Sequence, residues 1–176
     1  MHAASELAGR ILDLPRLSAM GDEAARQLVE RSSVVELAPG EALFREGDPP
    51  GDLYVVLSGG LKVTCRAHSD IEVVVGEAGP GALVGEMSLL DQATRSASAH
   101  AAEPTALLQI DAGHFVELVN TAHPAAWVLL RAVREQLVQR LRSVDERVDW
   151  VLDPTDDAPA PGGPDAQRDA SPGSSS

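Results

Sequence analysis

GALVGEMSLLDQATRSASA, residues 81–99, departs from the short β-type runs that lie on either side of it. Its GEMSLL portion predicts a helical turn that begins after Gly85. Two charged side chains flank this turn, because Glu86 lies at its start and Arg95 follows nine residues later. The stretch is therefore a candidate binding site between two predicted strands.

The chemistry of this stretch suits a nucleotide. A helix N-terminus carries unpaired backbone N–H groups and a partial positive charge, and both attract a phosphate. Arg95 can add a bidentate, charge-assisted pair to the same anion, whereas the Glu86 carboxylate can accept from the hydroxyls of a ribose. The alternative is that Glu86 and Arg95 form an ordinary surface ion pair.

The flanking sequence predicts a β unit. Between residues 34 and 110 the chain breaks into short β-type runs separated by Gly and Pro, including LYVVL (53–57), LKVTC (61–65), IEVVV (71–75) and TALLQI (105–110). Several short strands at even spacing are typical of a sandwich, a jelly roll or a small barrel. We expect about eight antiparallel strands here.

Helical patterns lie on both sides of the β unit. Residues 4–32 show apolar residues at helical spacing, with a break at Pro15. Asp111 is a plausible N-cap for a short helix that ends near Asn120, and a long helix begins at Pro124 and continues to about Leu152. The predicted fold class is mainly β, with N-terminal helices and a long C-terminal helix.

Residues 81–99 closely resemble the phosphate-binding cassette of cyclic nucleotide-binding domains of the catabolite activator and protein kinase A regulatory subunit type. The motifs are Gly-Glu-Met-Ser-Leu-Leu at 85–90 and Arg-Ser-Ala-Ser-Ala at 95–99. LAPGEALFREGDPPGDLYVVLSGGLKV, residues 37–63, is similar to the first strands of that fold. The resemblance covers about residues 7–152 and implies an eight-stranded antiparallel β-roll. We call residues 84–97 the cassette.

The resemblance also implies roles for single residues. Arg95 would pair with the cyclic phosphate, helped by the Ser96 hydroxyl and by the backbone N–H groups of Ser88 and Ser96. Glu86 would accept from the ribose 2′-hydroxyl beside Gly85, and the long helix would close over the base. The full set of ligand-binding residues expected on this basis is Val84, Gly85, Glu86, Met87, Ser88, Arg95, Ser96, Val144 and Asp145.

The base of the nucleotide stays open. Val144 and Asp145 stand where the activator family has a Thr-Ser pair that contacts adenine, and a valine offers no hydrogen bond. Asp145 can accept from adenine or from guanine, or it can be solvated helix surface. Cyclic AMP and cyclic GMP both remain candidate ligands, and no other cofactor is expected.

Composition excludes several classes of function. The net charge is −13, which argues against a general nucleic-acid binder, and the chain contains only five aromatic residues for stacking bases. The single cysteine, Cys65, excludes a disulfide framework. The five His residues show no metal-type spacing, and no apolar stretch is long enough to span a membrane. We expect a non-enzymatic, cytoplasmic protein without a metal.

The expected organisation has four parts: helices over 1–33, the β-roll over 34–123, the lid and dimer helix over 124–152, and a disordered acidic tail over 153–176. A parallel homodimer through the long helix is favoured, because apolar residues follow steps of three and four. The alternative is that this helix packs on its own β unit. The residues of the stripe are Leu130, Leu137, Leu141, Val144, Val148 and Val151.

These features together predict a stand-alone regulatory module that senses a cyclic nucleotide and moves its C-terminal helix toward an unidentified protein partner. DNA binding by this chain alone is not expected, since no helix-turn-helix pattern follows the long helix. The alternative is a degenerate module that acts as a dimeric interaction protein without a ligand. Hydrolysis of the cyclic ester ranks far behind both.

Overall fold

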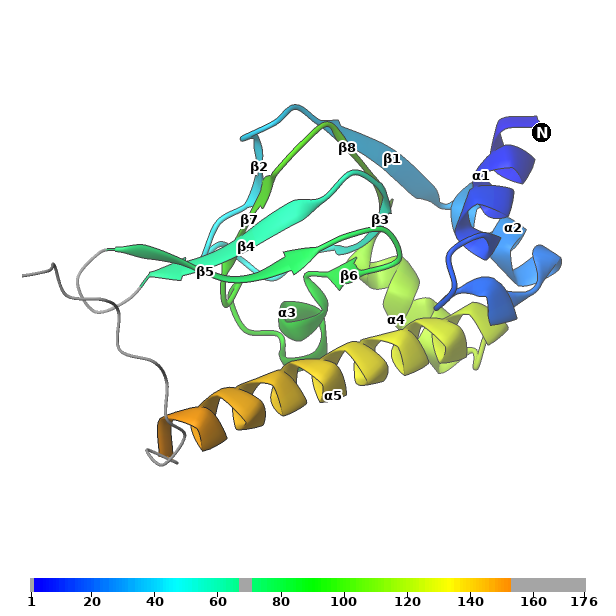
Figure 1. Cartoon of the computed structure of the whole chain (residues 1–176). Helices are drawn as coiled ribbons and strands as arrows, with labels where there is room; N and C mark the ends of the chain where they lie inside the picture. Colours follow the sequence, from blue (N-terminus) through cyan, green and yellow to red (C-terminus); the bar gives the residue numbers. More distant parts are fainter. Residues whose placement is uncertain (1, 67–70, 153–176) are drawn as a thin grey trace, which may run out of the picture. The chain divides into compact units, whose positions relative to one another are not determined.

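The computed structural model describes residues 2–66 and 71–152, with side chains described for 4–66 and 71–142 (Figure 1). The chain divides into two units, Met1–Arg140 and Leu141–Ser176, and the sheets, the cassette and all contacts discussed below belong to the first unit. The expected tail, 153–176, lies outside the described residues, as does the segment 67–70.

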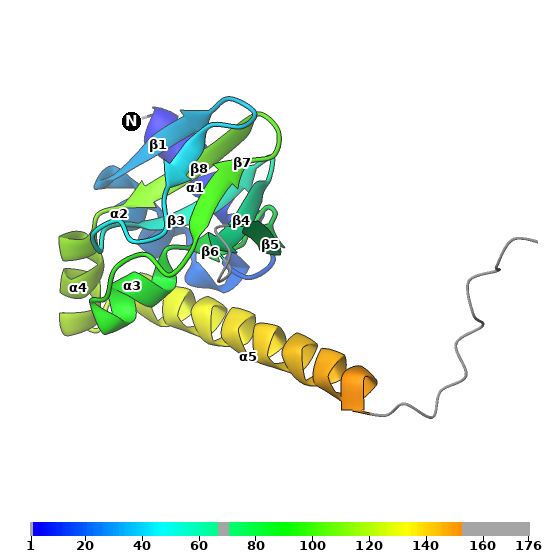
Figure 2. The same cartoon turned by 90° about the vertical axis from the view of Figure 1, so that its left-hand side faces the viewer.

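Among the described residues, eight antiparallel strands form two four-stranded sheets. The first sheet has the order β1-β8-β3-β6 and the second has the order β2-β7-β4-β5 (Figures 1 and 2). The strands are β1 (Ser32–Leu37), β2 (Ala42–Phe44), β3 (Leu53–Ser58), β4 (Leu61–Arg66), β5 (Glu72–Ala78), β6 (Leu83–Val84), β7 (Ser98–Ala101) and β8 (Thr105–Ile110).

Two apolar cores arise from the alternation of side chains along the strands of the first sheet. Val56 and Leu107 face the interior of the β-roll, where they pack with residues of the second sheet. Val55 and Leu108 face the other side of the first sheet, where they pack against helices. All four of these side chains are fully buried. The first sheet is therefore packed on both faces at its centre.

Of the helices, α1, α2 and α4 lie near one end of the β-roll, while α3 lies among the strands (Figures 1 and 2). Asp111 caps α4, because its Oδ1 atom accepts from the backbone N–H of His114 at 2.9 Å. The helical elements are α1 (His2–Leu12), η1 (Ser18–Met20), α2 (Asp22–Glu30), α3 (Glu86–Asp91), α4 (Ala112–Asn120) and α5 (Pro124–Leu152). Within 2–66 and 71–152, α3 is the only helix inserted between strands, and it follows β6 within the cassette.

The predicted fold class is confirmed: a mainly β chain with an eight-stranded antiparallel roll, N-terminal helices and a long C-terminal helix. The apolar stripe of α5 starts differently from the expected dimer seam. Leu130 and Leu137 pack against the chain's own core, whereas Leu141 is 66% exposed. Val144, Val148 and Val151 lie outside the residues whose side chains are described. The first part of the stripe is thus explained by packing within the chain.

Candidate functional site

Gly85 makes the turn that starts the cassette, between β6 and α3. It has φ of 87°, in the left-handed region that favours glycine. A Cβ atom at this position would lie 2.9 Å from the backbone oxygen of Asp52 and would collide with the guanidinium of Arg95. Glycine is therefore required here both for the backbone angle and for the room that the arginine takes.

Arg95 is buried at the centre of the cassette, with 5% of its surface exposed. Its Nη1 donates to the backbone oxygen of Gly85 at 3.0 Å and to the hydroxyl of Ser88 at 2.8 Å. Its Nη2 donates to the backbone oxygen of Asp52 at 2.9 Å. The guanidinium also lies over the ring of Phe44, 4.3 Å from the ring centroid. The β-roll and the cassette thus fix this side chain from several directions.

These contacts use only some of the N–H donors of the charged Arg95 guanidinium. Arginine has five N–H donors, and three of them serve Gly85, Ser88 and Asp52. Among the described residues no partner is found for the other two donors, the Nε–H and the second Nη2–H. Burial lowers the pKa of Arg95, while Tyr54 and nearby carboxylates oppose the shift. An arginine stays protonated at neutral pH, so the site offers a fixed positive charge with donors to spare.

Glu86 is the second buried charge of the cassette, with 3% of its surface exposed. Its Oε1 atom accepts from Nη1 of Arg140 at 2.7 Å. Arg140 lies on α5, 54 residues along the chain. A carboxylate has about four acceptor positions, so Glu86 can accept from a ligand hydroxyl as well as from Arg140. The surface ion pair considered for Glu86 and Arg95 is not formed, because each residue has other partners.

The remaining predicted residues fall into three groups. Ser88 is buried, and its hydroxyl accepts from Arg95 and donates to the backbone oxygen of Gly85 at 3.3 Å. The Ser96 hydroxyl donates to the sulfur of Met87 at 3.7 Å, and Met87 is 43% exposed. The side chain of Val84 packs in the core of the β-roll. Val144 and Asp145 lie in α5, outside the residues whose side chains are described.

Four further residues hold the site and were not identified from sequence: Phe44, Asp52, Gln136 and Arg140. Phe44 and Asp52 belong to the region that resembles the family, but nothing in their local pattern indicates contact with Arg95. Gln136 and Arg140 lie one turn apart on α5, where their spacing is that of any helix. Only the folded chain brings these residues to the cassette.

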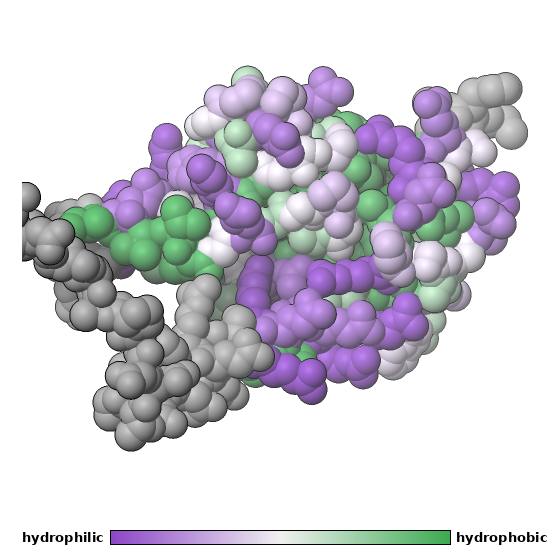
Figure 3. Space-filling view, in the orientation of Figure 1, coloured by the Kyte–Doolittle hydropathy of each residue, from purple (hydrophilic) through white to green (hydrophobic). Residues whose placement is uncertain are grey.

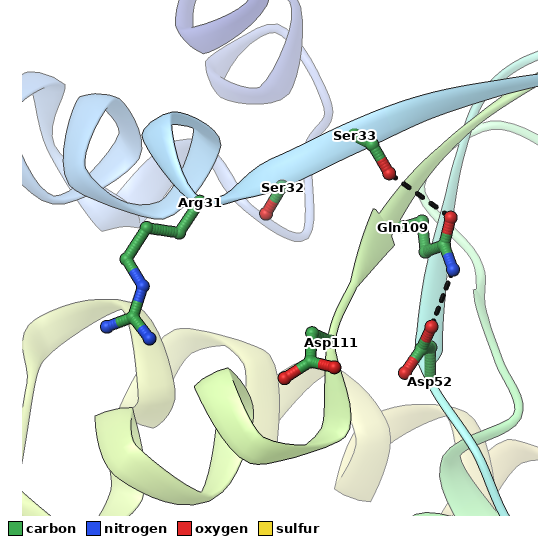
Figure 4. Close-up of a pocket in the computed structure, with 6 residues that line it drawn as sticks. All are labelled: Arg31, Ser32, Ser33, Asp52, Gln109 and Asp111. Carbon is green, nitrogen blue, oxygen red and sulfur yellow. Dashed lines mark hydrogen bonds between the residues drawn. The ribbon is translucent and has the colours of Figure 1, made fainter.

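A separate pocket of about 270 Å³ opens near the start of β1 and the end of β8 (Figure 4). Its polar groups already serve the fold, because Asp52 accepts from Gln109 at 2.5 Å and from the backbone N–H of Ala112 at 3.1 Å. The carboxylates of Asp52 and Asp111 repel an anion, and the guanidinium of Arg31 already pairs with Glu117 at 2.8 Å, so the pocket does not suit a phosphate. Its lining residues are Arg31, Ser32, Ser33, Asp52, Gln109 and Asp111.

Metal-binding clusters and membrane-spanning helices are both absent from the described residues. Within 2–66 and 71–152, no group of three or more His, Cys, Asp or Glu residues is arranged to hold a metal ion. No helix in the same part of the chain is both long and apolar enough to cross a membrane.

Comparison with known proteins gives a consistent family. Residues 34–122 match the cyclic nucleotide-binding domain model. The Cyclic AMP receptor protein of Thermus thermophilus is 39% identical over 100 residues, covering 54% of this chain and 46% of its own length. Lysophospholipase nte1 of Aspergillus fumigatus is 32% identical over 113 residues, covering 64% of this chain and 7% of its own length.

A solved structure agrees. The N-terminal domain of a transcriptional regulator from Streptomyces coelicolor is 35% identical, with a TM-score of 0.61, and the match covers 74% of this chain and 93% of that one. The chain spans less than half the length of the two curated relatives named above. Because the family match extends from Val34 to Ala122, half of the chain, and contains the whole cassette, the chain belongs to the cyclic nucleotide-binding domain family.

Proposed function

We propose that this chain is a regulatory module that binds a cyclic nucleotide, cyclic AMP or cyclic GMP, between Arg95 and Glu86. One observation carries the proposal: a buried arginine is held with spare donors in the same cassette as a buried carboxylate. The name of the Thermus relative, Cyclic AMP receptor protein, supports cyclic AMP as the first ligand to test.

The two charges suit the two polar parts of such a ligand. A cyclic phosphate carries one negative charge, and the Nε–H and the second Nη2–H of Arg95 can donate to it in a charge-assisted pair. A ribose 2′-hydroxyl is a donor, and the Glu86 carboxylate can only accept when ionised. The proposed roles of the Ser88 and Ser96 backbone N–H groups, of the Ser96 hydroxyl and of Asp145 at the base belong to the same proposal.

The proposed output is a change in α5. Glu86 is bonded to Arg140 of that helix, so a ligand that contacts Glu86 acts on a group already joined to α5. A ligand with different affinity for two positions of the helix shifts their populations. We propose that α5 then contacts a protein partner, and that Leu141, 66% exposed, belongs to a homodimer contact along this helix. A cytoplasmic location belongs to the same proposal.

The module itself is proposed to be a sensor without catalysis. The cassette supplies groups that bind, and its buried acid, Glu86, is engaged by Arg140. Incubation with cyclic AMP and analysis for the linear monophosphate checks this statement. The expected result is unchanged ligand, and the linear product would contradict it.

A second candidate is a protein-interaction module that has lost its ligand. Ile71 and the three valines at 73–75 are 42–62% exposed, and apolar side chains gather over the β4–β5 hairpin (Figure 3). Exposed apolar patches of this kind mark interaction surfaces in many proteins. This candidate predicts no response to any cyclic nucleotide.

Thermal unfolding separates the two candidates. A ligand that binds only the folded state stabilises it by about 2.7 kcal/mol at a hundred times its dissociation constant. The protein is melted alone and with millimolar cyclic AMP, cyclic GMP or linear 5′-AMP as the control. An upward shift of several degrees with one cyclic nucleotide alone supports the sensor and identifies the base. Equal melting curves in all four samples would contradict it and favour the interaction module.

A further inference from the structure

The second sheet ends at β5, which pairs with β4 on one side only. Among the described residues, no backbone hydrogen bond joins residues 72–78 to any segment other than β4. Ile71, just before the strand, is 62% exposed, and the three valines at 73–75 are 42–55% exposed. These apolar side chains belong to the patch over the β4–β5 hairpin (Figure 3). A long, apolar and unpaired edge of this kind is a template for another strand.

The other edges of the two described sheets are better protected. β6 has only two residues, and the Gln136 side chain of α5 donates to the backbone oxygen of Leu83 at 2.7 Å and accepts from its backbone N–H at 3.0 Å. β2 has three residues. β1 has six, and its exposed side chains include Ser33 and Glu36 within the strand. Short length, a covering group and polar side chains all limit strand addition, so β5, with seven residues, is the most open edge.

Two glutamates frame the apolar run of β5. Glu72 and Glu77 are both exposed, and residues 73–76 between them carry no charge. On the occupied side, the register partners of these glutamates are Arg66 and Lys62 of β4. Opposite charges on opposed residues stabilise a pair of strands, and like charges destabilise it. The chain's own β4, LKVTCR, therefore shows the chemistry of a strand that fits β5: apolar in the centre and basic toward both ends.

Parts of this edge are already engaged. The Glu72 carboxylate accepts from the Thr64 hydroxyl and lies 3.5 Å from Nε2 of His100. The Glu77 carboxylate has no hydrogen bond or ion pair among the described residues. Val75 has no register partner in β4, because the pairing is shifted there by a bulge. Since a bulge disturbs the ladder locally, we expect the docked strand to be short, and Glu77 to be the glutamate that best reports its charge.

We propose that the free edge of β5 binds an extended segment of a protein partner, apolar in its centre and basic at both ends, as a further antiparallel strand. In this mode of recognition, backbone hydrogen bonds give affinity and side chains give specificity. The net charge of −13 attracts such a basic segment. A second copy of β5 fits less well, because it would bring two glutamates in place of the basic residues. The inference does not depend on nucleotide binding.

The probe is a fluorescein-labelled peptide, LKVTVSR, whose two basic residues are five positions apart, like Glu72 and Glu77. Its binding to the full chain is measured by fluorescence anisotropy in the absence of any nucleotide. LEVTVSE reverses both charges of the peptide. LKVPVSR places a proline at the centre, which removes a backbone donor and is not tolerated in a central strand.

Three variants of the protein locate the docking edge. E77K reverses the charge of the unengaged glutamate, and V74K places a lysine in the apolar run at a position that is 55% exposed. E36K is the matched control, because Glu36 is an exposed glutamate on β1, an edge of the other sheet. Thermal unfolding without peptide confirms that each variant is folded.

The wild type is expected to bind LKVTVSR at least about tenfold more tightly than LEVTVSE or LKVPVSR. E77K should weaken the binding of LKVTVSR by about three- to tenfold, and should instead prefer LEVTVSR, in which a glutamate replaces the peptide lysine. V74K should weaken every peptide by about tenfold or more, since a lysine blunts a strand edge. E36K should stay within about twofold of the wild type. Bound peptide should slow amide hydrogen exchange in β5 and leave β1 unchanged.

Other results would overturn the inference. Equal affinity of the wild type for LKVTVSR and LEVTVSE would show that the charges of this edge do not select the partner. If none of the peptides binds, the edge does not accept a strand of this chemistry. Self-association of the chain that V74K abolishes would assign the edge to a second copy instead. None of these measurements uses a nucleotide, so each result leaves the proposed function to its own test.

Discussion

The two ends of the cassette are held by different parts of the molecule. Arg95, at the proposed phosphate end, is fixed by groups of the β-roll and of the cassette itself, namely Gly85, Ser88, Asp52 and Phe44. Glu86, at the proposed ribose end, is held by Arg140 of α5. The difference indicates that the phosphate end is held by the β-roll and the cassette, while the ribose end depends on where the helix lies.

The comparison predicts which ligand loses affinity in each variant. A change at the phosphate end is expected to weaken cyclic AMP and 2′-deoxy cyclic AMP by the same factor, because both ligands carry the phosphate. A change on α5 is expected to weaken only the ribose ligand. The ratio of the two affinities therefore reports which end of the cassette a variant disturbs.

G85A is expected to give the largest effect. The added Cβ collides with Arg95 and lies 2.9 Å from the Asp52 carbonyl, so affinity for both ligands should fall by about a hundredfold or more. The matched control is G40A, because Gly40 also has a left-handed φ of 83° but an open space around its Cβ position. The control should lose only about 1 kcal/mol of stability. Wild-type affinity in G85A, measured by calorimetry, would contradict the packing described for Arg95.

S88A is expected to weaken binding by about tenfold, because the buried Nη1 of Arg95 loses an acceptor at 2.8 Å. The two ligands should be affected equally, as measured by titration calorimetry. S33A is the control, since the Ser33 hydroxyl donates to Gln109 on another part of the surface. A loss confined to cyclic AMP would place Ser88 at the ribose end and contradict its assignment to the phosphate end.

F44L is expected to give a smaller loss, of about two- to fivefold for both ligands, because it removes the cation–π contact with Arg95, and such a contact contributes about 0.5–1 kcal/mol. The control is Y54F, which keeps the neighbouring ring, 6.3 Å from Phe44. Calorimetry with both ligands measures the effect. If F44L binds as tightly as the wild type, the ring does not help to hold the guanidinium.

His114 is expected to affect stability alone. Burial, followed by the charge of Arg31, lowers its pKa, and its buried Nδ1 has no hydrogen-bond partner among the described residues. The imidazole therefore has a higher pKa in the unfolded chain and is protonated there first as the pH falls. The free energy of unfolding is greatest above about pH 6.5 and decreases as the pH drops toward the folded-state pKa of His114. Glu117 and Asp111 oppose the shift.

Urea unfolding between pH 7.5 and 5.5 measures how the free energy of unfolding changes with pH. One histidine contributes at most about 1.4 kcal/mol per pH unit to this slope. H114Q should have a shallower slope than the wild type. The preference between the two ligands at neutral pH should be unchanged in H114Q. An unchanged slope in H114Q would show that His114 is not the group that titrates.

The residues that belong to one local motif could be predicted from the sequence. Gly85, Glu86 and Arg95 are recognisable because their spacing within one short stretch is itself the signal. The β-roll was predictable because Gly and Pro separate short apolar runs, although β2 and β6 are too short to appear as runs. These features are encoded by neighbours in the chain.

The partners of those groups could not be predicted in the same way. Gln136 and Arg140 are ordinary polar residues of a long helix, and their contacts with Leu83 and Glu86 arise only from tertiary packing. The apolar stripe of α5 shows the same limit, because a seam for a second helix and a face for the chain's own core share one periodicity. Leu137 lies on the face that packs against the chain's own core.

Calorimetry of cyclic AMP binding to the wild type and to R95K tests whether Arg95 binds the phosphate. Lysine keeps the positive charge but cannot form the planar fork that serves Gly85, Ser88 and Asp52 together with a phosphate. We expect binding of one nucleotide per chain by the wild type, and a loss of about a hundredfold or more in a folded R95K. Equal affinity in the two proteins would contradict the assignment of Arg95 to the phosphate.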